Sequence, residues 1–178
     1  MKKVLIITTS LRRNSNSEAL ALAFAEGARS AGNDVEVVSL KDKKLAFCKG
    51  CFACQNIGHC VIDDDANAIA DKMEQAEVIV WATPVYYYGM SGQMKTLIDR
   101  ANSLYSRPYK FKKVYLLATA TENESFTPEG TVKGVQGWVD CFDDVEFTDT
   151  LFVGDVTDPN DIQGNPGVKK AFDLGATV

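Results

Sequence analysis

Short apolar segments alternate along this chain with longer segments whose apolar residues recur at helical spacing. The run at residues 2–9 lacks polar alternation, which is typical of a strand buried on both faces of a parallel sheet. A polar loop follows at 10–17, and then an Ala- and Leu-rich segment at 18–31 with apolar residues on one helical face. A second strand is predicted at 35–40, so this part of the chain indicates a strand–helix–strand unit with a right-handed crossover.

The remaining pattern continues the same alternation. Further strands are predicted at 77–82, 114–119 and 145–153, and further helices at 63–75, 91–104, 127–142 and 166–174. Residues 41–62 show neither period and predict a long connection, which in a compact domain is more often functional than filler. We therefore expect one α/β domain over residues 1–178, with a five-stranded parallel sheet and a cysteine-rich loop at 41–62.

The loop after the first strand is rich in hydroxyl and amide side chains. It contains no glycine, so both the GxGxxG dinucleotide fingerprint and the GxxxxGK[ST] phosphate loop are absent. Free N–H groups and the helix dipole favour an anion where the next helix begins. Side chains that can donate to phosphate oxygens, and one cation, lie there: Ser10, Arg12, Ser15, Asn16 and Ser17. The loop favours a terminal phosphate, and the alternative is a polar turn in which Ser15 or Ser17 caps the helix.

Three consecutive tyrosines, Tyr86–Tyr88, follow the third strand and precede Gly89. They cannot all face a core, so some of their rings must be exposed in a loop at the end of the sheet. A flat aromatic ligand can lie against such rings, and Gly89 permits its close approach to the backbone. The alternative is that the rings pack on neighbouring loops or on a second subunit.

Four of the five cysteines crowd into thirteen residues, with the spacing Cys48-x2-Cys51-x2-Cys54-x5-Cys60. Four thiolates at two-residue gaps can wrap a [4Fe–4S] cluster, although the ferredoxin run has x3 before its last cysteine. Zinc is disfavoured, because the second C-x2-C pair of a zinc site is missing. A redox pair such as Cys51 with Cys54, or a set of unligated thiols packed as small apolar groups, remain alternatives.

Other residues whose side chains could bind a metal or take part in a reaction have simpler interpretations. We expect His59 in an exposed loop, Asp63–Asp65 complementing a helix dipole, and Trp81 and Trp138 in the core or an interface. Cys141 is expected to be buried in a helix and inert.

These features together resemble a known family. The two loops are similar to those of the flavodoxin-like NAD(P)H-dependent FMN reductases, and the segment 48–65 resembles their iron-sulfur flavoprotein branch. The resemblance implies a flavodoxin-like three-layer α/β/α sandwich with strand order 2-1-3-4-5. It also implies FMN bound by three loops, through Ser10, Arg12, Ser15, Asn16, Ser17, Pro84, Val85, Tyr86, Tyr87, Gly89, Thr119 and Ala120. The chain departs from the family where Thr9 and Leu11 flank Ser10, and where a third loop that is often glycine-rich reads Ala118-Thr119-Ala120-Thr121.

The net charge of the chain limits the classes of partner that it is expected to bind. Nineteen Lys and Arg against twenty-four Asp and Glu give a net charge of −5, which argues against nucleic acid or an anionic membrane as partner. No apolar run is long enough to span a membrane, and the apolar stretch at 4–7 is too short for a signal-peptide core. We expect a cytoplasmic protein, where structural disulfides are unlikely on redox grounds.

The resemblance implies an FMN-dependent oxidoreductase that moves electrons from NAD(P)H to a quinone, an azo or nitro compound, a flavin or an electron-carrier protein. Because the flavin carries the chemistry, no catalytic residue is named. A [4Fe–4S] cluster on Cys48, Cys51, Cys54 and Cys60 would split the electron pair, and its loop is expected at the edge of the flavin site. The family further implies a homodimer or homotetramer. The alternatives are a non-enzymatic flavodoxin-type or iron-sulfur flavoprotein electron carrier, and a redox or iron sensor.

Overall fold

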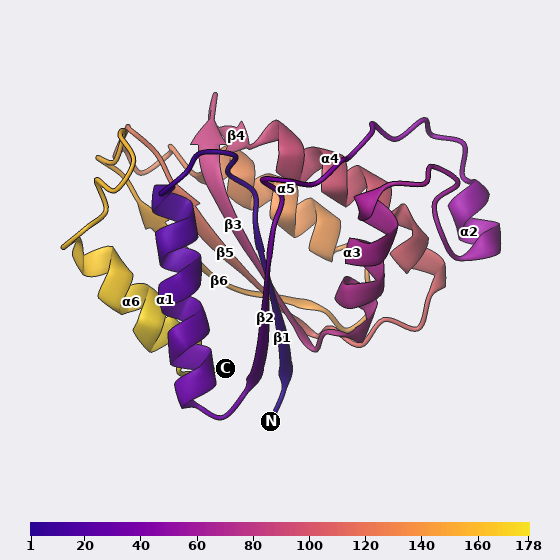
Figure 1. Cartoon of the computed structure of the whole chain (residues 1–178), viewed down its shortest axis with the longest axis horizontal. Coiled ribbons are helices and arrows are strands. Elements are labelled where there is room, and N and C mark those ends of the chain that lie inside the picture. Colours follow the sequence, from indigo (N-terminus) through magenta and orange to yellow (C-terminus); the bar gives the residue numbers. More distant parts are fainter.

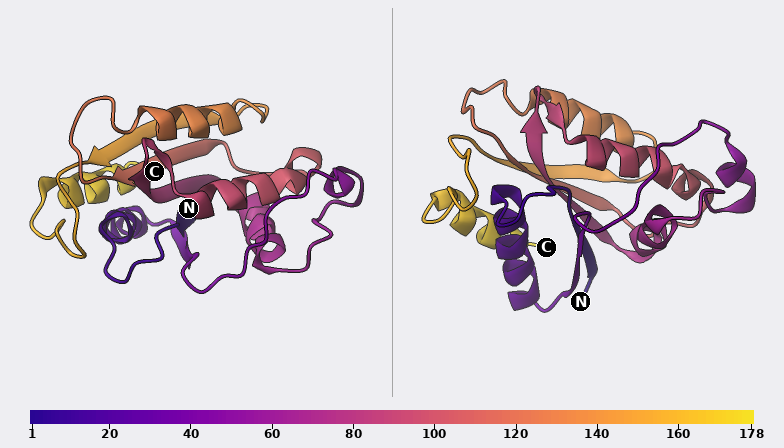
Figure 2. Two further views of the ribbon diagram at one scale, coloured as in Figure 1. Left: turned by 90° about the horizontal axis from the view of Figure 1, so that it is seen from above. Right: turned by 45° about the horizontal axis from the view of Figure 1, so that its top comes forward.

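A parallel sheet lies between two layers of helices in the computed structural model, which describes residues 1–178 (Figures 1 and 2). The strands are β1 (Lys3–Thr8), β2 (Asp34–Ser39), β3 (Val78–Tyr86), β4 (Gly89–Met90), β5 (Lys113–Thr119) and β6 (Glu146–Val153). The helices are α1 (Asn16–Ser30), α2 (Ala53–Ile57), α3 (Asp65–Gln75), α4 (Gly92–Arg100), α5 (Glu129–Val139) and α6 (Pro166–Gly175), with a 3₁₀ helix, η1 (Ala101–Ser106), after α4.

The five long strands run parallel in the order β2-β1-β3-β5-β6, and β4 pairs antiparallel with the end of β3. In the centre of the sheet, Ile6 of β1 lies between Val37 of β2 and Val80 of β3. This is the predicted order 2-1-3-4-5, with β5 and β6 as the fourth and fifth long strands. The reversal of strand order on either side of β1 creates the switch point at which such sheets bind ligands.

Two apolar clusters fill the spaces between the layers, one on each face of the sheet. Alternate residues of each strand point to opposite faces, so Ile6 joins the cluster under α1 and α6, while Ile7 joins the cluster under α3, α4 and α5. Trp81 is a fully buried core residue, and the partly buried Trp138 packs on it edge to face, with the ring centroids 5.6 Å apart. The three-layer α/β/α sandwich is therefore confirmed.

The glycines of α5, which weaken its prediction from sequence, are explained by packing. A Cβ on Gly130 would lie 2.2 Å from the carbonyl oxygen of Tyr88, and one on Gly134 would lie 2.6 Å from Cε of Met90. The β3–β4 hairpin thus rests directly on the backbone of α5. This contact outweighs the low helix propensity of glycine, which is about 1 kcal/mol per residue.

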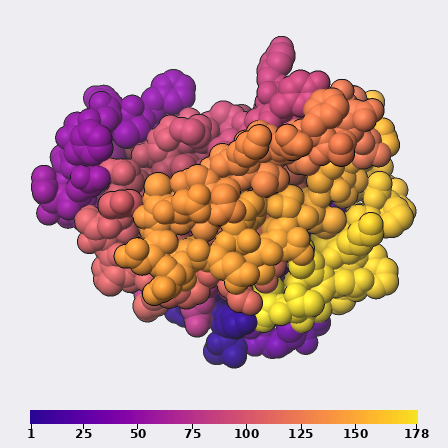
Figure 3. All heavy atoms as spheres, turned by 180° about the vertical axis from the view of Figure 1, so that it is seen from behind, coloured from indigo at the N-terminus to yellow at the C-terminus, as the bar shows by residue number.

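Three short elements differ from the predictions. The two-residue β4 and the five-residue α2 are too short to show a period, and the helix predicted at 91–104 ends at Arg100 and continues as η1. Seen from behind, α5 covers the sheet, while the β3–β4 hairpin and the cysteine-rich loop form two separate projections (Figure 3). No helix has the length and apolar character needed to cross a membrane.

Candidate functional site

A cavity of about 110 Å³ lies at the carboxyl ends of β1, β3 and β5. Nine of the twelve expected FMN contacts line it: Ser10, Arg12, Ser15, Asn16, Pro84, Val85, Tyr86, Thr119 and Ala120. Ser17, Tyr87 and Gly89 lie outside its lining. Sequence reasoning missed the segment after β6, which adds Val156, Thr157 and Pro159, because that segment carries no recognisable phosphate- or flavin-binding pattern.

The first loop places the N-terminus of α1 at this cavity. The Ser15 hydroxyl caps the helix by accepting from the Glu18 N–H at 3.3 Å, so the capping interpretation of Ser15 is confirmed. The side chain of Asn16 holds the loop after β6, since Nδ2 donates to the Asp158 carbonyl and Oδ1 accepts from the Ile162 N–H. The backbone N–H groups of Asn16 and Ser17 have no hydrogen-bond partner. Two free donors at a helix N-terminus favour an anion.

Arg12 supplies the positive charge of the cavity. Its Nη1 donates to the Thr157 carbonyl at 2.7 Å, and the guanidinium makes no ion pair. A guanidinium has five N–H donors, so most of its donors remain available. The charge and the free N–H groups together match a phosphate.

The second loop is a tight hairpin turn made by Tyr87 and Tyr88. Both residues adopt left-handed backbone conformations, with φ of 49° and 61°, which strains residues other than glycine. Gly89 is not left-handed, and a Cβ there would meet only the Tyr86 carbonyl oxygen, at 3.7 Å. The Tyr87 side chain is fully exposed, while the Tyr88 ring lies 5.8 Å from that of Phe126.

Glu122, which follows the third loop at residues 118–121, also contacts this hairpin. A hydrogen bond to the Glu122 carboxylate raises the pKa of Tyr88, and the negative charge of Glu122 adds to the effect. Of the three tyrosines, Tyr86 lines the cavity, whereas Tyr87 and Tyr88 do not.

A buried hydroxyl network joins the first two loops, and sequence reasoning missed it. The hydroxyls of Thr9 and Ser91 lie 2.9 Å apart, and the Ser91 N–H donates to Thr83 Oγ1 at 3.2 Å. The Ser91 hydroxyl also caps α4 by accepting from the Met94 N–H. All three hydroxyl residues are fully buried. Residues far apart in sequence make this network, so no local pattern could reveal it.

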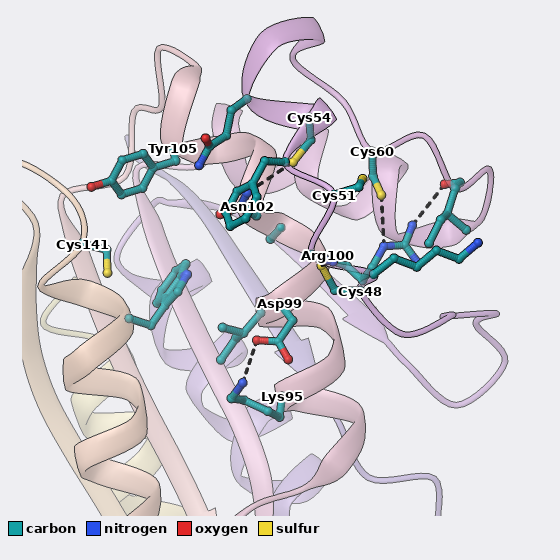
Figure 4. Close-up of a pocket in the computed structure, with 18 of the residues that line it drawn as sticks. Cys48, Cys51, Cys54, Cys60, Lys95, Asp99, Arg100, Asn102, Tyr105 and Cys141 are labelled. Atoms are coloured by element: carbon teal, nitrogen blue, oxygen red, sulfur yellow. Dashed lines mark hydrogen bonds and ion pairs between the residues drawn. The ribbon is translucent and has the colours of Figure 1, made fainter.

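A second cavity, of about 630 Å³, lies between the cysteine-rich loop, α4, η1 and α5 (Figure 4). Cys48, Cys51, Cys54 and Cys60 all line it as free thiols. No three His, Cys, Asp or Glu side chains converge on a point where they could hold one metal ion. A [4Fe–4S] cluster binds each thiolate to a different iron, so it requires wider spacing of the sulfurs.

The surroundings of these sulfurs fit thiolate ligands. Arg100 Nε donates to Cys60 Sγ and Asn102 Nδ2 donates to Cys54 Sγ, both at 3.3 Å, as the dashed lines in Figure 4 show. The Gly50 N–H donates to Cys48 Sγ at 3.4 Å. Hydrogen bonds to the sulfurs are a principal means by which proteins tune iron–sulfur clusters.

A buried ion pair underlies this site. Arg100, whose side chain is 0% exposed, pairs with Asp64, whose side chain is 9% exposed, at 2.6 Å. Burial alone would raise the pKa of Asp64, but hydrogen bonds from Arg100 and from two backbone N–H groups lower it. Burial would lower the pKa of Arg100, and its bonds to Asp64 and Cys60 raise it. Asp64 also caps α3 and Asp65 lies in its first turn, so acidic side chains stand at the helix start, where we expected them to complement the dipole.

One expectation about the cysteines is wrong. Cys141 is exposed, because α5 ends at Val139, and it lines the second cavity opposite the cysteine-rich loop. The cysteine-rich loop starts at the carboxyl end of β2, where Lys41 and Phe47 line a hollow together with Leu11 of the first loop, and the first and second cavities share no residue. Its expected place at the flavin edge stays a prediction. Helix α4 runs from Ser91 near the first cavity to Arg100 at the second; its nine residues span about 14 Å at 1.5 Å each. His59 is exposed, as expected.

A parallel sheet of this order, with helices on both faces, defines a flavodoxin-like fold. Residues 2–136 match the family described as NADPH-dependent FMN reductase, and the chain belongs to this family.

Two sequence relatives are iron-sulfur flavoproteins. The protein from Methanosarcina thermophila is 30% identical over 156 residues, which cover 87% of this chain and 82% of the relative. The protein from Methanocaldococcus jannaschii is 38% identical over 102 residues, which cover 57% of this chain and about half, 53%, of the relative.

Solved structures show the same fold. An NAD(P)H:quinone oxidoreductase from Methanothermobacter marburgensis superposes with a TM-score of 0.76 at 17% identity, over 99% of this chain and 95% of that one. An FMN-dependent NADH-azoreductase from Bacillus anthracis in complex with FMN gives a TM-score of 0.71 at 14% identity, over 99% of each chain.

Proposed function

We propose that this protein is an FMN-dependent oxidoreductase that takes electrons from NADPH or NADH and passes them to an acceptor. One observation carries the proposal: nine residues expected to contact FMN meet at one cavity. Arg12, one of the nine, makes no ion pair, and the backbone N–H groups of Asn16 and Ser17 have no hydrogen-bond partner. Membership of the NADPH-dependent FMN reductase family supports the same conclusion.

The chain's own residues bind and orient the cofactor. Arg12 and the N–H groups of Asn16 and Ser17 are suited to the phosphate, with Ser10 as a further donor. The cavity is smaller than the roughly 300–1,000 Å³ of typical small-molecule sites, so most of FMN must bind outside it, along the exposed hairpin. When bound, FMN supplies hydride acceptance and electron release, and the protein supplies position and electrostatics.

A second candidate function is electron carriage through an iron–sulfur cluster. Cys48, Cys51, Cys54 and Cys60 line one cavity, and three of their sulfurs accept N–H bonds. Relatives named iron-sulfur flavoproteins favour a [4Fe–4S] cluster at these residues. A bound cluster supplies one-electron transfer, which suits an electron-carrier protein as acceptor; a small quinone, azo or nitro compound suits the flavin alone.

The exposed aromatic hairpin also favours self-association. Tyr86, Tyr87 and Tyr88 are 47%, 103% and 49% exposed, which leaves a contiguous apolar surface on one chain. A homodimer or homotetramer would cover these rings. The five free thiols suit the reducing conditions of the cytoplasm.

Flavin titrations of flavin-free protein test the proposed site. We expect FMN to bind more tightly than riboflavin, and Arg12→Ala to weaken FMN binding by about 1–3 kcal/mol, because a charge-assisted hydrogen bond is lost. Riboflavin, which has no phosphate, should bind the variant as it binds the native protein. Arg13→Ala is the matched control, since Arg13 is exposed and outside the cavity.

Equal losses for FMN and riboflavin in Arg12→Ala would refute the phosphate assignment. Steady-state oxidation of NADPH with a quinone then separates an enzyme from a carrier, because a carrier shows almost no turnover without a partner reductase.

A further inference from the structure

The cysteine-rich segment 46–62 has few buried apolar side chains and few internal hydrogen bonds to hold it in place. Phe47, Phe52 and Val61 are 79%, 62% and 56% exposed, and Cys54 is its one buried apolar side chain. Its internal backbone hydrogen bonds belong to α2 and the turns beside it. All hydrogen bonds that join it to the rest of the chain run through four side chains: Asp64, Asn67, Arg100 and Asn102.

Arg100 and Asn67 make three of these hydrogen bonds each, and Arg100 is the one side chain of the four that bonds both ends of the segment. Its Nη1 donates to the Ala46 carbonyl at 2.8 Å and its Nη2 donates to the Ile62 carbonyl at 3.1 Å, so one side chain joins both ends of the segment. The same two nitrogens bind the Asp64 carboxylate, and Nε donates to Cys60 Sγ (Figure 4). All five N–H donors of the guanidinium are therefore used, and the side chain is wholly buried.

We propose that Arg100 is the positioning residue of the cysteine site: it holds the segment in its ligand-presenting shape before any metal binds, and its Nε–H stabilises negative charge on the Cys60 sulfur. The first part stands on these contacts alone, whereas the second rests on the proposed cluster. The role needs the planar fork of arginine, because a lysine ammonium has three donors on one atom and cannot reach acceptors on both ends of the segment.

Arg107 provides a matched control. It follows η1, its side chain is 14% exposed, and it pairs with Asp71 and Glu74 of α3. It makes no hydrogen bond to the cysteine-rich segment. Arg107→Lys therefore disturbs a similar buried ion pair in the same region and leaves the segment's attachments intact.

Hydrogen exchange on cluster-free protein tests the first part. In Arg100→Lys we expect amides of 46–62 to exchange at least about 10-fold faster than in the native protein, because hydrogen bonds to a charged group are lost. Amides of the central sheet should be unchanged, and Arg107→Lys should match the native protein within the segment. Equal exchange in the native protein and Arg100→Lys would overturn the positioning role. If Arg100→Lys fails to fold, Asp64→Asn, which removes the charge that anchors the guanidinium, should give the same acceleration.

The reduction potential tests the second part. After reconstitution with iron and sulfide, we expect the cluster potential of Arg100→Lys to be more negative than that of the native protein, because the reduced cluster loses an N–H bond to sulfur. Arg107→Lys should keep the native potential. Equal potentials in the native protein and Arg100→Lys would refute the effect on Cys60. Native protein that takes up no iron would refute the proposed cluster, and the exchange result would still decide the positioning role.

Discussion

The ion pair of Asp64 with Arg100 predicts an unusually large loss of stability for a single carboxylate. Both side chains are almost fully buried, so removal of one leaves an uncompensated charge in the interior. Breaking such a pair costs about 3–5 kcal/mol. Asp64 also caps α3 through the Ala66 N–H at 3.1 Å, and loss of a cap costs about 1 kcal/mol. We therefore expect Asp64→Ala to lose about 4–6 kcal/mol and Asp64→Asn, which can still cap the helix, about 3–5 kcal/mol.

Urea unfolding of the flavin-free protein measures both values. The two variants should differ by about 1 kcal/mol, which is the contribution of the cap. A loss below about 1 kcal/mol for Asp64→Asn would refute the reasoning, because the pair would then behave like an exposed salt bridge.

Acid provides a second measure of the same pair. The fold lowers the pKa of Asp64 below its ordinary value of 3.8, so the ionised carboxylate stabilises the folded state. This contribution is complete well above pH 3.8 and is lost as the pH falls through the lower folded pKa. The stability difference between the native protein and Asp64→Asn should therefore shrink only as the pH falls below 3.8 toward the lower folded pKa of Asp64. A difference that shrinks near neutral pH would contradict this assignment.

Three further predictions follow from other parts of the structure. Gly130→Ala should lower the free energy of unfolding by about 1–3 kcal/mol and weaken FMN binding in a flavin titration, because the added Cβ meets the Tyr88 carbonyl. Gly137→Ala, whose Cβ would lie in open space, should instead stabilise α5 by about 1 kcal/mol. Cys51→Ala should abolish iron binding after reconstitution and leave FMN affinity unchanged, and an iron content equal to that of the native protein would contradict the ligand set. Tyr87→Ser should shift the protein to a smaller species in light scattering, and an unchanged mass would exclude this side chain from the interface.

Local sequence patterns predict most of this fold. Buried strands without alternation, helices with one apolar face and polar loops after the strands are properties of neighbouring residues. All five long strands occur at the predicted places, although β3 continues to Tyr86, beyond its predicted end at residue 82. The glycines of α5 could not be interpreted this way, because they are required by the packing of α5 against the β3–β4 hairpin, which is distant in sequence. The exposure of Cys141 follows from the end of α5 at Val139, and such helix boundaries are weakly encoded.

In the candidate sites, too, residues of one local segment could be predicted, whereas contacts between distant segments could not. Arg12 and Ser15 could be identified because they lie in one loop before one helix. Arg100 could not, because its acceptors come from both ends of a loop, which lie 54 and 38 residues earlier in the chain. The expected contact of Tyr87 with FMN stays a prediction, since its side chain is fully exposed at the tip of a turn and lies outside the cavity lining.

Anaerobic mixing of FMN-loaded protein with NADPH or NADH tests the central claim most directly. The account predicts that the protein binds one FMN per chain, that the visible flavin band bleaches on mixing, and that the band returns when a quinone is added. A flavin that stays oxidised in excess of both nicotinamides, or a protein that binds no FMN, would contradict it.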